Sequence, residues 1–201
     1  MAIQDWERRD LFDFEVGPGR GGAIDDKAIK LISGRIGIKD LSSLGINTIP
    51  VFTFHSFWLK FDGGGKIVFQ LAPYSEDPNV VYQPDMGYQF EYLFEPTTSD
   101  PNVNNRLTIT IKKDFTDFSP IVSWQIANLN LDTWYNFKNE YNTGVDYMTG
   151  NTVGRLVVRD GNNDILLQID DTTYQNSKKR LWIWGFSEGV WIDDLEIWEL
   201  I

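Results

Sequence analysis

Apolar and polar residues alternate with a period of two along most of the chain, the spacing typical of β-strands that bury one face. In the segment 53–61, the odd-numbered residues, Phe57 among them, share one face, and the even-numbered residues, Trp58 among them, share the other. The pattern predicts about eleven strands, and the first segment, 27–38, contributes one or two of them. They lie at 27–38, 53–61, 66–71, 88–94, 106–113, 121–126, 134–141, 154–160, 164–169, 180–186 and 190–200.

The segments between these strands are rich in Gly, Asn, Asp and Pro, the residues that tight chain reversals require. They lie at 62–65, 73–78, 96–102, 142–144, 160–163 and 187–189. Helical spacing is confined to one short turn at 38–46, and no internal repeat is evident. The sequence therefore predicts an all-β fold.

The chain has 201 residues, a length suited to one domain. About eleven strands exceed what an immunoglobulin sandwich of about 100 residues holds, and they fit two packed sheets of a jelly roll. We therefore expect a two-sheet antiparallel β-sandwich of the jelly-roll type. It is expected to form a single domain over 1–201, with 1–10 as an N-terminal lead-in.

Charge and composition remove several classes of partner and of chemistry. Lys and Arg number 18 against 29 Asp and Glu, and the net charge of −11 disfavours nucleic acid and anionic membranes as partners. The chain has no Cys, which excludes disulfides and thiolate metal sites. It has one His, His55, which excludes zinc sites formed by several histidines. The N-terminal residues show no secretory or lipidation pattern. The sequence is compatible with a location on a virion surface or outside the cell after assembly.

Five segments carry a resemblance to a known superfamily: KAIKLISGRIGIKD at 27–40, TFHSFWLKFDGGGKIVF at 53–69, WYNFKNEYN at 134–142, GRLVVRDGNNDIL at 154–166 and VWIDDLEIWEL at 190–200. Together they resemble the concanavalin A-like (laminin-G-like) jelly-roll superfamily over most of residues 11–200. The resemblance implies a jelly roll whose ligand contacts come from the loops and the concave sheet. It also implies that the first and last strands pair.

The resemblance raises the possibility of catalysis on a polysaccharide. A hydrolase would need paired carboxylates, and Asp194 and Glu196 share a strand face but lack the leading Glu of the superfamily pattern. A lyase would need a cation together with a Tyr or His base; the residues considered are His55, Lys60, Arg106, Tyr82, Tyr88 and Tyr92. We expect no enzyme. If there is one, we expect a polysaccharide lyase that uses His55, Arg106 or Tyr88, although His55 shares the face predicted to be buried.

Sugar binding would instead use exposed aromatic rings surrounded by hydrogen-bonding side chains. The candidate platforms are Trp58, Tyr82, Tyr88, Trp124, Trp182 and Trp184. The loops 73–87 and 96–105 are expected to form the rim of such a site. The alternative is that most of these rings pack between the two sheets.

Calcium is the cofactor that the sequence favours, because hard divalent cations prefer oxygen ligands. The candidate ligands are Asp13, Glu15, Asp193 and Asp194. If the first and last strands pair, as the resemblance implies, a structural Ca²⁺ would hold the two ends of the chain together. The alternative is that these carboxylates cap turns or face water.

Three hypotheses for function remain. The leading one is a non-catalytic, lectin-like recognition or scaffold module that binds a glycan or polysaccharide, for example on a phage or viral surface, tail or capsid-decoration protein. The second is a polysaccharide lyase or glycoside hydrolase on the same fold. The third is a purely structural subunit whose partners are the other proteins of an assembly or virion.

Overall fold

A computed structural model describes residues 6–8, 13–21, 26–38, 52–74, 86–96, 105–114, 121–145, 148–174, 178–186 and 189–199. These residues form thirteen strands. The strands are β1 (Trp6–Arg8), β2 (Asp13–Pro18), β3 (Lys27–Ile38), β4 (Phe52–Phe61), β5 (Gly65–Tyr74), β6 (Tyr88–Glu95), β7 (Arg106–Lys113), β8 (Val122–Ile126), β9 (Trp134–Val145), β10 (Thr152–Asp160), β11 (Ile165–Asp171), β12 (Lys178–Phe186) and β13 (Val190–Glu199). Among the residues described there is no helix with the length and hydropathy needed to span a membrane.

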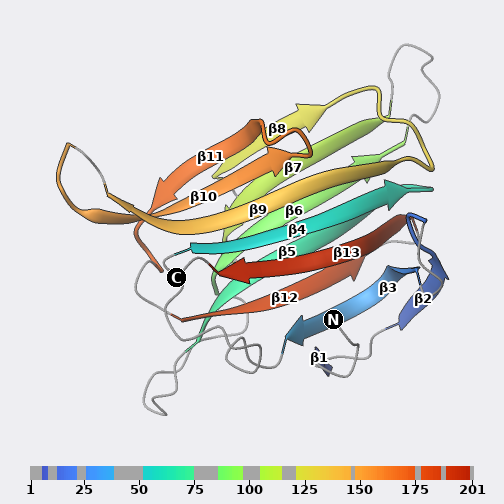
Figure 1. Cartoon of the computed structure of the whole chain (residues 1–201), viewed down its shortest axis with the longest axis horizontal. Coiled ribbons are helices and arrows are strands. Elements are labelled where there is room, and N and C mark those ends of the chain that lie inside the picture. Colours follow the sequence, from blue (N-terminus) through green and yellow to red (C-terminus); the bar gives the residue numbers. More distant parts are fainter. Residues whose placement is uncertain are drawn as a thin grey trace.

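The strands form two antiparallel sheets that β3 connects. Hydrogen bonds link the strands in the order β11-β10-β9-β4-β13-β3-β12-β5-β6-β7-β8, and β1 and β2 pair with β3. Residues 29–30 of β3 pair with β13, whereas residues 33–37 pair with β12, so the chain passes from one sheet to the other along this strand. In Figure 1 the layer β11-β10-β9-β4-β13 lies over β5, β6 and β7. The expected two-sheet jelly roll is confirmed.

Aromatic rings from both sheets meet in the core. Phe57 of β4 stacks on Phe69 of β5 with 4.1 Å between the ring centroids, and the edge of Tyr92 on β6 meets Phe57 at 5.5 Å. Phe61 and Phe94 stack at 4.5 Å in the same way. The odd-numbered face of β4 is therefore the buried one, as the alternation predicts.

The N-terminal region differs from the prediction. Residues 6–8, expected to belong to a lead-in, form β1 and pair with residues 36–38 of β3. β2 was not predicted either, because Gly17 and Pro18 interrupt its short apolar pattern. The helical turn predicted at 38–46 lies, apart from its first residue, outside the described residues, and the extent of the domain stays a prediction.

Candidate functional site

Three tryptophans lie on the outer face of the first sheet, on the strands β13, β4 and β9. Backbone register places Trp191 beside Lys60 and Lys60 beside Trp134. Trp58 occupies the next outward position along β4. Each ring is partly exposed, because each residue has the parity opposite to the core residues of its strand. We call the surface of Trp58, Trp134 and Trp191 the tryptophan face.

Lys60 lies between two of these rings. Its Nζ atom is 5.1 Å from the ring centroid of Trp134 and 5.2 Å from that of Trp191, within the range of cation–π attraction. The indole Nε1 of Trp191 donates a hydrogen bond of 2.6 Å to Asp62 Oδ2. A Cβ added to Gly17 would lie 2.5 Å from two ring atoms of Trp191, so β2 packs closely against this indole. These contacts fix the ring of Trp191.

Arg20, which follows β2, covers the third ring. Its guanidinium carbon lies 4.0 Å from the ring centroid of Trp58, and its Nη2 donates a 2.8 Å hydrogen bond to Asp194 Oδ2. The backbone N–H of Arg20 donates to Asp193 Oδ2 at 2.7 Å. Both carboxylates belong to a β-bulge of β13, where Asp194 adopts a φ of 47°. The bulge therefore places two carboxylates beside Trp58.

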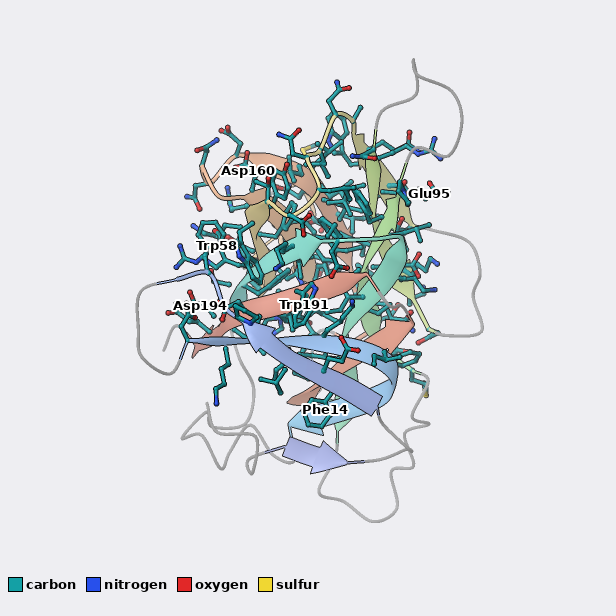
Figure 2. The ribbon with its side chains drawn as sticks, turned by 90° about the vertical axis from the view of Figure 1, so that its right-hand side faces the viewer. Phe14, Trp58, Glu95, Asp160, Trp191 and Asp194 are labelled. Atoms are coloured by element: carbon teal, nitrogen blue, oxygen red, sulfur yellow. The ribbon has the colours of Figure 1, made fainter. Side chains whose placement is uncertain are left out.

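The tryptophan face combines apolar ring surfaces with polar groups that hydrogen-bond. Figure 2 shows Trp58 and Asp194 on the same side of the sandwich, whereas Glu95 of the second sheet lies on the opposite side. Asn136 flanks Trp58 on β9 and donates from Nδ2 to the carbonyl oxygen of Phe57 at 3.0 Å. Indole faces suit the C–H face of a sugar ring, and carboxylates, amides and cations suit its hydroxyls. The tryptophan face therefore has the chemistry of a surface that can bind a saccharide.

The other predicted aromatic platforms are dispersed over the molecule. Trp184 is 2% exposed and packs with Val68 on the side of the second sheet opposite to the core, and Tyr88 is buried in the core. Neither ring presents a face to a sugar in this structure. Trp124 is 51% exposed, on the edge strand β8. Trp182 belongs to β12 but its side chain lies outside the described part, as does all of Tyr82.

The three catalytic candidates do not converge. Burial lowers the pKa of His55 to about 3, and neither ring nitrogen has a hydrogen-bond partner among the described residues. Burial, followed by a hydrogen bond to Asp171, raises the pKa of Tyr88. Arg106 is on β7, where its Nη2 pairs with Glu95 at 2.7 Å. His55 and Tyr88 are therefore buried groups, whereas the ion pair of Arg106 is solvent-accessible.

Two of the four carboxylates proposed as calcium ligands, Glu15 and Asp194, pair with cations. Lys30 Nζ lies 3.9 Å from Glu15 Oε2, and Arg20 binds Asp194. The last strand, β13, pairs with β3, the first strand that the sequence predicts, and with β4. β2, which contains Asp13 and Glu15, pairs with β3 in the part that the structure describes. Within that part, no group of three acidic or histidine side chains is arranged to hold a metal ion. The side chain of Asp13 is not described, and calcium stays a prediction.

Much of the tryptophan face was not predicted from the sequence. Trp58 was a predicted platform, whereas Trp134, Trp191 and the adjacent Arg20 were not. A signal was present, because Trp134 and Trp191 lie at the starts of predicted strands and have the outward parity there. Only the strand register shows that these two tryptophans are neighbours, because it places both of them beside Lys60.

Comparison with known proteins identifies the fold. No protein-family model and no curated protein sequence matches the chain. Among solved structures, the carbohydrate recognition domain of Emp46p in its potassium-bound form is similar at 12% identity with a TM-score of 0.54, covering 99% of this chain and 91% of that one. The legume lectin-like domain from Entamoeba histolytica is similar at 11% identity with a TM-score of 0.53, covering 99% and 92%.

An enzyme has the same architecture. Alginate lyase A1-II′, of polysaccharide lyase family 7, is similar at 15% identity with a TM-score of 0.51, covering 99% of this chain and 85% of that one. The protein thus has a concanavalin A-like jelly-roll fold. Both lectins and polysaccharide lyases have structures of this kind, so the fold by itself does not separate binding from catalysis.

Proposed function

We propose that this protein is a non-catalytic, lectin-like module that binds a glycan through the tryptophan face. The observation that carries the proposal is the presence of three partly exposed indoles on one sheet face, with the carboxylates of Asp193 and Asp194 at its border. Aromatic platforms bordered by polar side chains are the usual means of saccharide recognition. Two of the similar structures, by their names, are lectin-like or carbohydrate recognition domains.

A polysaccharide lyase is the alternative, and the positions of the candidate residues favour binding over turnover. Proton abstraction needs a base that reaches the substrate. His55 lies in the core with no exposed surface, and Tyr88 is buried and donates its hydroxyl hydrogen to Asp171 at 2.7 Å. Arg106, the candidate cation, is already paired with Glu95. The two candidate bases, His55 and Tyr88, are therefore buried, whereas the candidate cation Arg106 is at the surface.

The proposal also leaves room for the remaining expectations from the sequence. A structural calcium ion at the carboxylates of the chain ends is one of them. Display on a virion or another larger assembly, and a purely structural role there, are the others. Each can be tested separately from glycan binding.

Glycan-array binding of alanine variants tests the proposal. We expect Trp58→Ala and Trp134→Ala to weaken binding of the recognised glycan about tenfold, because a lost aromatic contact costs roughly 0.5–1.5 kcal/mol in addition to the lost buried area. Trp124→Ala is the matched control, since Trp124 is an exposed tryptophan on β8, outside the tryptophan face. The control variant should bind as the unmodified protein does.

Two results would contradict the proposal. The first is an array with no bound glycan, or one on which Trp124→Ala rather than Trp58→Ala loses binding. The second is turnover of a uronate polymer, seen as the ultraviolet absorbance of an unsaturated product, that disappears when His55 is substituted.

A further inference from the structure

Three cations lie over the rings of the tryptophan face: Arg20 over Trp58, Lys30 over Trp191, and Lys60 over Trp134 and Trp191. Lys60 differs from the other two in its carboxylate partners. Arg20 is paired with Asp194 at 2.8 Å, and Lys30 lies 3.3 Å from Asp62 Oδ2. The Nζ atom of Lys60 contacts the rings of Trp134 and Trp191 but has no carboxylate within ion-pair distance among the described residues. Within the described part of the chain, its positive charge is therefore not neutralised by a neighbouring carboxylate.

The carboxylate nearest in sequence is already engaged. Asp62 Oδ2 accepts hydrogen bonds from both Trp191 Nε1, at 2.6 Å, and Lys30 Nζ, at 3.3 Å. These two donors come from β13 and β3. Lys60 lies on β4, between Trp191 of β13 and Trp134 of β9.

We infer that Lys60 and the indoles of Trp134 and Trp191 form a subsite for a sugar residue that carries a carboxylate or sulfate group. This inference rests on the proposed function and deepens it, because it names the charge class of the ligand. The anionic group lies against the ammonium of Lys60, and the C–H face of the same sugar or of its neighbour stacks on an indole. A charge-assisted hydrogen bond of this kind is about twice as strong as a neutral one.

The negative net charge of the molecule does not prevent such binding. At physiological salt, exposed charges more than about 8 Å apart are largely screened, so the groups nearest to the sugar decide the outcome. At the subsite the ammonium groups of Lys60 and Lys30 lie 5.2 Å and 5.1 Å from the ring centroid of Trp191, and the carboxylate there, Asp62, is held by Lys30 and Trp191. The indoles also exclude water from one side of the ammonium, which strengthens its interaction with an anion.

The test uses matched sugars that differ only in charge. Oligosaccharides of glucose, mannose and galactose are compared with their counterparts oxidised to uronic acids and with their sulfated counterparts. We expect tighter binding of the acidic members, and a Kd for them that rises with salt. Lys60→Met, which keeps the length of the side chain, should weaken binding of the acidic members about tenfold and leave neutral sugars unaffected. Lys60→Arg, which keeps the charge, should retain most of the affinity.

The outcomes separate this inference from the proposed function. Binding of neutral sugars alone, or equal binding of acidic and neutral members that Lys60→Met does not change, overturns the charge requirement and leaves glycan binding intact. Binding to none of the sugars overturns both. Thermal unfolding of Lys60→Met shows whether the variant is folded; if it is not, Lys60→Gln is used in the same comparison. Preference for carboxylate over sulfate, or the reverse, identifies the anionic group.

Discussion

At the residue scale, His55 shows how strongly the alternation of strand faces constrains a polar side chain. It is fully buried between the sheets beside Asn139, its partner in the register of β4 and β9. Asn139 accepts a hydrogen bond from Tyr92 at 2.5 Å, whereas the nitrogens of His55 have no such partner in the described part of the chain. Burial of a polar group without a hydrogen bond lowers stability, and most of all when the group must carry a charge.

Stability in acid should therefore depend on His55. Burial lowers the pKa of His55 from 6.5 to about 3, so between these values the unfolded chain binds a proton that the folded chain does not. Folding stability must then fall as the pH drops through this window. We expect His55→Leu to show a smaller loss of Tm between pH 7 and pH 4 than the unmodified protein.

The comparison isolates the effect of protonating His55, because the chain contains a single histidine. Every carboxylate titrates equally in both proteins, so the difference in slope belongs to position 55. An identical fall of Tm in the two proteins would mean that His55 is solvated in solution.

At the element scale, the end of β11 connects the two sheets. Tyr88, at the start of β6, donates its hydroxyl hydrogen to Asp171 Oδ1 at 2.7 Å, and the N–H of Thr173 donates to the same oxygen. Burial alone would raise the pKa of Asp171, but the hydrogen bonds from Tyr88 and Thr173 and the charge of Lys113 outweigh it, so that the pKa is lowered. The ionised carboxylate therefore stabilises the fold.

Two neighbouring substitutions test this connection. Asp171→Asn should lower the free energy of unfolding by roughly 1–3 kcal/mol, because it weakens hydrogen bonds to a partly buried charge. Asp170→Asn is the matched control: Asp170 forms an exposed ion pair with Arg155, and such pairs contribute about 1 kcal/mol or less. Denaturant unfolding measures both. Equal effects of the two substitutions would argue against a stabilising role for the bond between Tyr88 and Asp171.

At the scale of the whole molecule, packing of rings between the two sheets holds the sandwich together. Phe57 is fully buried and contacts rings on β5, β6 and β9. Phe14 of β2 is 38% exposed. The same residue type thus occurs in the centre of the core and at the edge of the structure.

Phe57→Ala should therefore destabilise the protein by roughly 3–5 kcal/mol, as is usual for a large side chain lost from a core. Phe14→Ala should cost clearly less, because part of the surface of this residue is already exposed. Urea unfolding of the two variants makes the comparison. A cost for Phe14→Ala as large as that for Phe57→Ala would show that β2 contributes to the core as much as β4 does.

The fold was largely predictable from the sequence, whereas the candidate site was only partly so. Alternation identified β4 and its buried face, which contains Phe57, Leu59 and Phe61, because the pleat of a strand sends neighbouring side chains to opposite sides. It missed β2, which is short and contains Gly17 and Pro18. At the site it identified Trp58, Asp193 and Asp194 as separate candidates, for sugar and for calcium, but it did not bring them together.

What the sequence determined by itself was the all-β class, the antiparallel sandwich and the residues that face its core, since these follow from local alternation and turn residues. The tertiary structure decided which exposed side chains become neighbours. Lys60 lies between Trp134 and Trp191 only because β4 pairs with both β9 and β13 in one particular register. Register depends on contacts between residues far apart in the chain, and a shift of one residue would turn each of these side chains to the other face.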